Sequence, residues 1–337
     1  MKTAPHAGQT VQPALTRRDR DDSKQQQPYD DSARPDVAGV LAVVVLPGAR
    51  GVAQEVTGTF VPIEVQGAAL TAARAITADG RIVGFFGVVN GPQHGFLLAD
   101  GTLSTIDVPV PDARWTNVFG INARGDVVGA FGDKDLVQHG FLLQAYGAFT
   151  VIDGPSVTDD GPTIRTLAKG INAEGDITGY YDTEHKRHGF LLSRHGVFST
   201  IDMDGTVGPP PNGTFAQSIN ASGDIVGSFF NGAVHGFLMS EGTVTHLDVP
   251  FAGAVNTNAP GLNDRGDVAG FYTVNGRQLP FRRDRHGNYE ALEAPAAASS
   301  MLAIGINTPG DIVGQYTQTE NGVPVTRGFV LYRARTP

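Results

Sequence analysis

Histidine recurs at one equivalent position in four sequence repeats, each time opening a His-Gly-Phe-Leu motif: His94, His139, His188 and His235. Four imidazoles in register suggest a metal site, in which each ligand nitrogen lies about 2 Å from the ion. The motif is expected to begin the third strand of its repeat, about 10 Å out from the innermost strand. Neighbouring histidines then lie in different sheets, so we expect no metal ion shared between them.

Each of these histidines has a carboxylate in its own repeat, because an aspartate ends the strand that follows. In an antiparallel pair, the start of one strand and the end of the next meet at the same edge of the sheet. A pair that recurs in this way indicates a structural tie, since catalysis needs only one site; a catalytic dyad is the less favoured alternative. The expected pairs are His94 with Asp107, His139 with Asp153, His188 with Asp202, His235 with Asp248 and, with both partners exchanged, Arg327 with Glu64.

Aspartate also closes a second recurring motif, Asn-x-x-Gly-Asp. A calcium loop needs several oxygen ligands from alternate positions and a late carboxylate, which this motif does not supply. We therefore expect these aspartates to be turn residues. The copies are Asp126, Asp176, Asp224, Asp267 and Asp311.

The elements that position these residues follow from the repeat itself. Its fullest form, Gly-Ile-Asn-x-x-Gly-Asp-Ile-Val-Gly, is clearest at residues 170–179 and 305–314. The turn glycines of successive copies are 45, 50, 48, 43 and 44 residues apart, a period typical of propeller blades with about four strands each. Helical repeats of this length are excluded because no window keeps a 3.6-residue pattern free of glycine or proline.

Within one repeat, four short strands can be placed. In the fourth repeat they are expected at residues 216–219, 224–229, 236–239 and 243–248. The Asn-x-x-Gly element between the first two is typical of a hairpin, since asparagine tolerates the turn start and glycine the positive φ.

The two ends of the chain predict how the repeats join. The last repeat stops after its third strand, at residues 328–332, whereas residues 58–64 match the fourth strand at 101–107. Pairing between these ends would leave no open sheet edge. We therefore predict an all-β fold, a six-bladed β-propeller of four-stranded blades over residues 58–335, closed by the N-terminal strand 58–65.

The Gly-Ile-Asn-x-x-Gly-Asp and His-Gly-Phe-Leu motifs resemble those of the HAF family of extracellular repeat proteins, over residues 58–332. The family's usual His-Ala-Phe is His-Gly-Phe here, and the fifth repeat departs further with Leu279-Pro280-Phe281. The resemblance implies an exported β-repeat protein. It brings no established reaction.

Composition excludes several kinds of function, and the N-terminal region indicates where the protein is located. A net charge of −9 argues against nucleic-acid binding, and the absence of cysteine excludes disulfides and thiolate metal sites. Residues 1–36 are polar and are expected to be disordered. Residues 37–53 hold an apolar run that is too short for a stable membrane span and resembles a signal-peptide core with its cleavage site. We expect a secreted or periplasmic protein, with a cytoplasmic one as the alternative.

The remaining clue is the variability of the loops. Connections from strand two to three, and from strand four to the next repeat, are long, dissimilar and expected on one face, where binding residues concentrate on rigid scaffolds. We predict a monomeric, non-enzymatic protein that binds a glycan, peptide or protein there; the alternative is a lactonase-like hydrolase or lyase at the channel mouth. No cofactor is expected, although the sequence does not exclude a divalent cation bound in the central channel. The candidate ligand-binding residues are Trp115, Arg114, Asp159, Asp160, Arg165, Asp182 and His185.

Overall fold

The computed structural model describes residues 58–156, 159–206 and 208–334. These residues form β-strands joined by turns and loops, without a helix. It follows that no described helix could cross a membrane. The expected polar leader (1–36), the apolar segment (37–53) and residue 335 lie outside the described residues.

Four consecutive strands pair antiparallel in each of five units. The four strands expected for the fourth repeat are present with slightly shifted ends. The units are β2 (Ala68–Ile76), β3 (Ile82–Val88), β4 (Gln93–Ala99) and β5 (Thr102–Ile106); β6 (Trp115–Ile121), β7 (Val127–Gly132), β8 (Gln138–Leu143) and β9 (Phe149–Ile152); β10 (Arg165–Ile171), β11 (Ile177–Asp182), β12 (Arg187–Leu192) and β13 (Phe198–Ile201); β14 (Thr214–Ile219), β15 (Ile225–Phe230), β16 (Val234–Ser240) and β17 (Thr243–His246); β18 (Val255–Leu262), β19 (Val268–Val274), β20 (Arg277–Arg283) and β21 (Tyr289–Ala291).

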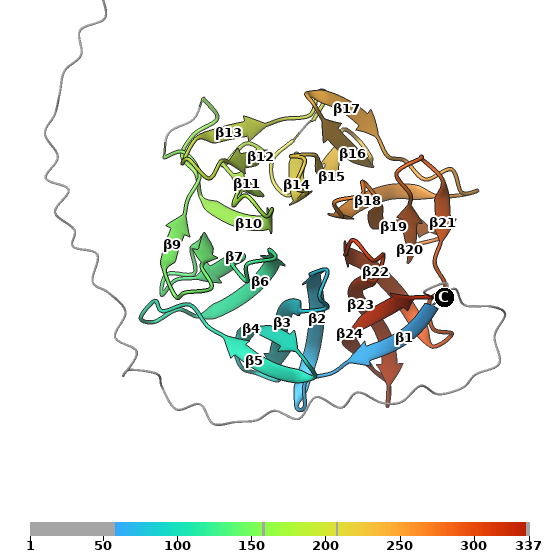
Figure 1. The fold of residues 1–337 in the computed structure, drawn as a ribbon. Helices are drawn as coiled ribbons and strands as arrows, with labels where there is room; N and C mark the ends of the chain where they lie inside the picture. Colours follow the sequence, from blue (N-terminus) through green and yellow to red (C-terminus); the bar gives the residue numbers. More distant parts are fainter. Residues whose placement is uncertain (1–57, 157–158, 207, 335–337) are drawn as a thin grey trace, which may run out of the picture. The chain divides into compact units, whose positions relative to one another are not determined.

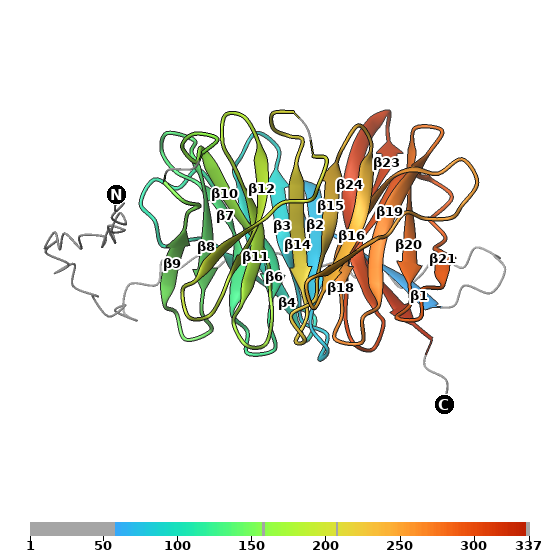
Figure 2. The ribbon, with the colours of Figure 1, turned by 90° about the horizontal axis from the view of Figure 1, so that it is seen from above.

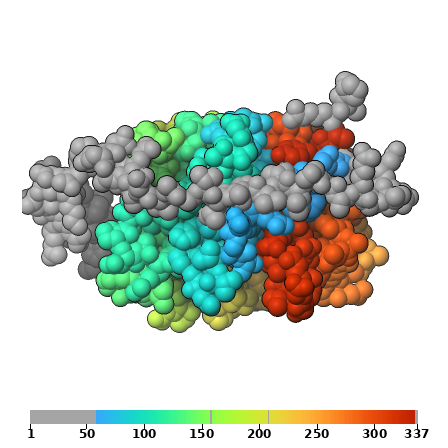
Figure 3. All heavy atoms as spheres, turned by 90° about the horizontal axis from the view of Figure 1, so that it is seen from below, coloured from blue at the N-terminus to red at the C-terminus, as the bar shows by residue number. Residues whose placement is uncertain are grey.

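A further unit combines both ends of the described chain. It contains β22 (Ala298–Ile306), β23 (Ile312–Glu320), β24 (Val323–Arg333) and β1 (Gly58–Ile63). Strand β1 pairs antiparallel with β24, in a register that runs from Gly58 opposite Arg333 to Ile63 opposite Gly328. Figure 3 shows the blue atoms of the N-terminal strands against the red atoms of this unit.

The units follow one another around a central cavity, with the first strand of each unit innermost (Figure 1). Successive first strands contact one another, and β22 contacts β2. Units are otherwise joined by few backbone bonds, such as the single parallel bridges between Leu70 and Thr326 and between Arg165 and Gln138. The strands run between two opposite faces (Figure 2). The Asn-x-x-Gly turns join the first strand of each unit to the second, so they lie together at one of these faces.

Close packing explains the glycine that ends the Gly-Asp-Ile-Val-Gly motif inside the second strand, and the His-Gly-Phe at the start of the third strand. Gly179 in β11 lies opposite Phe190 in β12. A Cβ at Gly179 would lie 2.0 Å from the carbonyl oxygen of Leu167 and 2.7 Å from the Phe190 ring, so only glycine fits. Phe190 is fully buried against it, and the same Gly–Phe pairing recurs in the other units.

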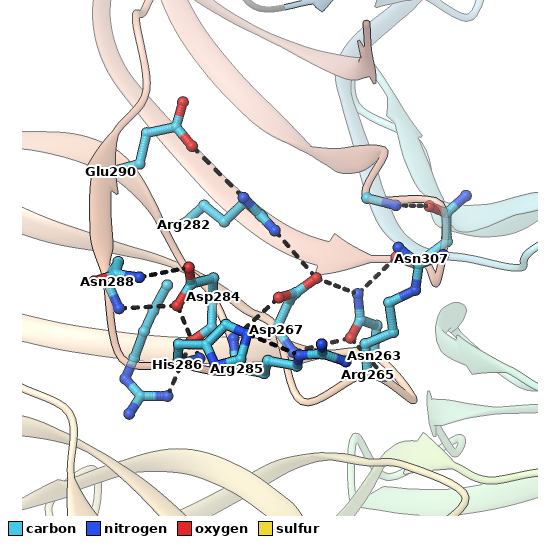
Figure 4. A network of polar contacts seen from close by, with 12 residues as sticks. Asn263, Arg265, Asp267, Arg282, Asp284, Arg285, His286, Asn288, Glu290 and Asn307 are labelled. Carbon is cyan, nitrogen blue, oxygen red and sulfur yellow. Dashed lines mark hydrogen bonds and ion pairs between the residues drawn. The ribbon is translucent and has the colours of Figure 1, made fainter. Parts of the chain in front are cut away.

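The turn asparagines join neighbouring units. The Nδ2 of Asn263 donates to the carboxylate of Asp267 in its own turn and to the carbonyl of Asn307 in the next unit, at 3.2 and 2.9 Å (Figure 4). The Oδ1 accepts from backbone N–H groups inside the turn. We call this ring of inter-unit bonds the asparagine belt. Its donors are Asn122, Asn172, Asn220, Asn263 and Asn307.

The turn aspartates are used within the fold. Asp267 also accepts a hydrogen bond from the backbone N–H of Arg285, 3.1 Å away, and pairs with Arg282 at 3.2 Å. Burial acts to raise the pKa of Asp267, but its hydrogen bonds and Arg282 outweigh burial and lower that pKa below its usual value. Asp126, Asp176 and Asp311 accept the equivalent bond from the backbone N–H groups of Ala145, Arg194 and Arg333, which ties each of these hairpins to the outer part of its unit.

Candidate functional site

The structure brings each expected histidine–aspartate pair together inside one unit. The Nδ1 atoms of His94, His139, His188 and His235 lie 2.8–3.0 Å from carboxylate oxygens of their partners. Arg327 lies 3.2 Å from Glu64, the residue that follows β1, and also pairs with Glu320. Each histidine packs on an aromatic ring of the second strand, as His188 does on Tyr181 with ring centroids 4.9 Å apart.

The pair in the third unit is the most enclosed. The His188 side chain is only 5% exposed, and its Nε2 lies 3.3 Å from Asp160, one of the candidate ligand residues. Asp202 receives hydrogen bonds from His188 and from Lys186, both at 3.0 Å. Burial acts to raise the pKa of Asp202, but these two partners outweigh it and lower the pKa below its usual value.

On the long-loop face, Trp115 and Arg114 line one cavity between the first two units. The Trp115 ring lies over Gly132, where a Cβ would be 2.4 Å from the indole Nε1. The other polar side chains that line this cavity are Asn90, Gln93, Asn117 and Gln138. Asn117 donates to Gln93 at 2.9 Å, while its buried Oδ1 has no hydrogen-bond partner.

The other candidate ligand residues do not join that cavity. Asp182 is fully buried and paired with both Arg165 and Arg187; the two arginines occupy both carboxylate oxygens. Its role in the structure is therefore an internal ion pair. The backbone N–H of His185 donates to Thr183 in a loop of the third unit, and Asp159 is an exposed turn residue. The seven residues thus separate into a group around Trp115 and a group in the third unit.

Sequence reasoning missed the lining of the central cavity, which measures about 410 Å³ and extends along the first strands to the Asn-x-x-Gly turns. One lining position recurs in every unit, two residues before the end of the first strand. It varies from unit to unit, so the repeat motif carries no signal for it. The residues there are Arg74, Phe119, Lys169, Gln217, Pro260 and Ile304.

Two of these residues are basic and lack a described carboxylate partner. The guanidinium of Arg74 lies 4.9 Å from the Phe85 ring centroid, and Nζ of Lys169 lies 3.5 Å from that of Phe119. Burial lowers the pKa of Arg74 to about 10. Burial and the charges of Arg74 and Arg187 lower the pKa of Lys169 well below its ordinary value. A divalent cation in this channel, which the sequence left open, would be repelled by both side chains.

The described residues contain no other cluster of side chains that could bind a metal ion. No group of three or more His, Asp or Glu side chains comes close enough to hold an ion. The pairs stay in separate units, as their strand positions require.

Comparison with known proteins gives no family for this chain. No protein-family model matches it, and no curated protein matches it. The resemblance to HAF repeats therefore stays a hypothesis that depends on the two motifs.

Several solved structures are similar over most of the chain. Virginiamycin B lyase from Staphylococcus aureus is 12% identical, with 83% of this chain and 89% of that chain covered and a TM-score of 0.42. TolB from Acinetobacter baumannii is 12% identical, with 74% and 63% covered and a TM-score of 0.48. The Aleuria aurantia lectin in complex with α-methyl-L-fucoside is 12% identical, with 81% and 97% covered and a TM-score of 0.45. Similarity at this level says nothing about what this chain binds.

Proposed function

We propose that residues 58–335 form a closed six-bladed β-propeller that binds a glycan on its long-loop face without catalysing a reaction. Closure by β1 is supported by its pairing with β24 and by the bond from Asn307 to the carbonyl of Thr77. In this proposal the six four-stranded units are the blades, and the belt fixes their order around the axis.

The observation that carries the binding proposal is the cavity around Trp115. It combines one indole ring with the amides of Gln93, Asn117 and Gln138 and the guanidinium of Arg114. Binding sites typically join an aromatic or apolar surface to a few convergent polar groups that fix the ligand's orientation. The unpartnered Oδ1 of Asn117 is a hydrogen-bond acceptor that a ligand hydroxyl would satisfy.

A glycan suits this lining better than a charged peptide does. Amide groups both donate and accept, which matches hydroxyl groups that do the same. The indole ring offers a flat apolar surface for the C–H face of a sugar ring. The described lining contains hydrogen-bonding side chains and one arginine, a set suited to recognition.

Export is part of the same proposal. It is supported by the apolar segment 37–53, which resembles a signal peptide. A secreted protein meets extracellular glycans directly.

The test is a binding screen of the purified chain against a panel of neutral oligosaccharides, followed by Trp115→Ala. We expect the variant to bind a hit at least tenfold more weakly, because a central aromatic side chain usually dominates the binding energy. Its melting temperature should stay close to that of the wild type. Tyr146→Ala removes an aromatic side chain that is 78% exposed outside this cavity, and it should change neither property.

Three outcomes would contradict the proposal. A large fall in melting temperature with unchanged binding would make Trp115 a packing residue only. Binding that is lost through Glu174→Ala, at an exposed residue of an Asn-x-x-Gly turn, would put the site on the opposite face. A screen in which only peptides bind would replace the glycan with a peptide ligand.

A further inference from the structure

The charged side chains in the lining of the central cavity are two basic ones and one carboxylate, that of Asp264 at the Asn-x-x-Gly end. The chain carries a net charge of −9, yet the side chains that enter the cavity from the first and third units are Arg74 and Lys169. Beside them, Asp182 is shared by Arg165 and Arg187, so that this triad keeps one positive charge. Buried cations without partners are costly, and ionisable groups perturbed by burial cluster at functional sites.

The two cations are held in place by aromatic rings. Arg74 lies over Phe85, Phe85 meets Phe119 edge to face at 6.1 Å, and Lys169 lies over Phe119. Cation–π contacts stabilise a positive charge but leave its hydrogen-bond donors unused. The Nε of Arg74 is buried without a hydrogen-bond partner, and Lys169 makes no described ion pair. Both side chains can therefore donate to a ligand.

The opposite side of the cavity is apolar along the strands, apart from Asn258 of the fifth unit. Pro260, Leu302 and Ile304 line it from the fifth and sixth units, together with Phe271. Gln217 and Ser228, joined by a 3.3 Å hydrogen bond, lie in the fourth unit between the two sides. A ligand that fits this lining has an anionic end and an apolar body.

We propose that the central cavity is a binding site for a small amphipathic organic anion, whose carboxylate lies between Arg74 and Lys169 and whose apolar body lies against Pro260, Leu302 and Ile304. The volume of about 410 Å³ falls within the range of small-molecule sites, roughly 300–1,000 Å³. Entry is from the Asn-x-x-Gly face, where small side chains such as Ala78, Ala123 and Ala173 line the cavity.

Isothermal titration calorimetry with three probes tests the proposal on the full chain. Benzoate has both the charge and the apolar ring, benzamide is its uncharged counterpart, and sulfate is an anion without an apolar body. We expect benzoate to bind with 1:1 stoichiometry and at least tenfold more tightly than either benzamide or sulfate.

Variants assign the binding to the two cations. Lys169→Met and Arg74→Met should each weaken benzoate binding at least tenfold, while Lys169→Arg, which keeps the charge, should weaken it less. Lys134→Met removes an exposed lysine outside the cavity and is the matched control. Melting curves establish that each variant is folded.

Several results would overturn the proposal. Equal affinity for benzoate and benzamide would show that the negative charge of the ligand does not contribute to binding. Unchanged benzoate binding in the folded Lys169→Met and Arg74→Met variants would place the site elsewhere. Absence of binding by all three probes to the folded wild type would also contradict it. Trp115→Ala should keep full benzoate affinity, so failure at the glycan site and failure at this site are separate results.

Discussion

The side-chain amide of Asn307 donates a 3.1 Å hydrogen bond to the backbone carbonyl of Thr77, which joins the last unit to the first across 230 residues of sequence. Asn307 is 3% exposed, and its Oδ1 accepts from the backbone N–H groups of Gly310 and Asp311. The first unit has Thr77 where the others have asparagine. Its link to the second unit comes from Arg81, which donates to the carbonyl of Ala123 at 2.8 Å.

We predict that Asn307→Ala lowers the free energy of unfolding by about 1–3 kcal/mol, because buried backbone groups lose their only side-chain partner. Urea unfolding measures the change. Asn288→Ala is the matched control, since Asn288 also bonds within a turn, to Asp284, but is exposed. Equal effects of the two substitutions would show that the bond to Thr77 adds no stability.

Phe60 in β1 provides a second test of the junction between the two ends. Its ring stacks on Phe329 at 5.3 Å and meets Tyr316 edge to face at 5.5 Å. We predict that Phe60→Ala destabilises the protein by about 3 kcal/mol, as expected when a packed aromatic side chain is removed from a core. Val244 occupies the same repeat position in β17 but is 42% exposed, so Val244→Ala should cost far less. Similar midpoints for both variants in urea would mean that β1 contributes little to the last unit.

The sequence predicted those features that every repeat shares. The four strands, the Asn-x-x-Gly hairpin and the partner of each histidine follow from position within the repeat, because the same local contacts recur in each unit. The bond from each asparagine to the next unit was not predicted, since it depends on how units pack against one another. A single repeat carries no information about that packing.

Features that differ between units could not be predicted from the sequence for a similar reason. Arg74 and Lys169 occupy equivalent positions in two repeats, but only the arrangement around the axis brings them into one cavity. Asp182 was expected to be a ligand residue because its loop varies. Its burial between Arg165 and Arg187 depends on pairing across β10, β11 and β12 that spacing alone does not reveal.

The lowered pKa of Asp202 predicts a pH dependence of stability. A carboxyl group with a lower pKa in the folded than in the unfolded chain stabilises the fold above its unfolded pKa, about 3.9, and loses that contribution as pH falls through the folded value. We therefore predict that Asp202→Asn is less stable than the wild type at pH 7 and that the difference shrinks below about pH 4.

Unfolding free energies measured from pH 7 to pH 3 test this dependence. Asp107→Asn is the matched control, because the Asp107 carboxylate is 51% exposed and should contribute less. A difference between Asp202→Asn and the wild type that is constant with pH would show that the contribution does not depend on the charge.

Lys169 supplies the last prediction, which concerns stability without any ligand. Its folded pKa lies well below the ordinary value, so the charged form is disfavoured in the fold and favoured in the unfolded chain. The resulting destabilisation is absent above the unfolded pKa, about 10.4, and grows as pH falls toward the folded pKa. Lys169→Met removes this penalty, and we predict that it raises the free energy of unfolding at pH 7. Lys134→Met, at an exposed lysine paired with Asp135, should leave stability nearly unchanged.

Repeating the comparison near pH 10.5 separates the effect of charge from that of packing. If Lys169→Met is still more stable than the wild type there, the added stability comes from packing of the methionine side chain. If Lys169→Met is less stable than the wild type at pH 7, the charged amine of Lys169 is already stabilised by other groups in the folded protein, which would contradict the prediction.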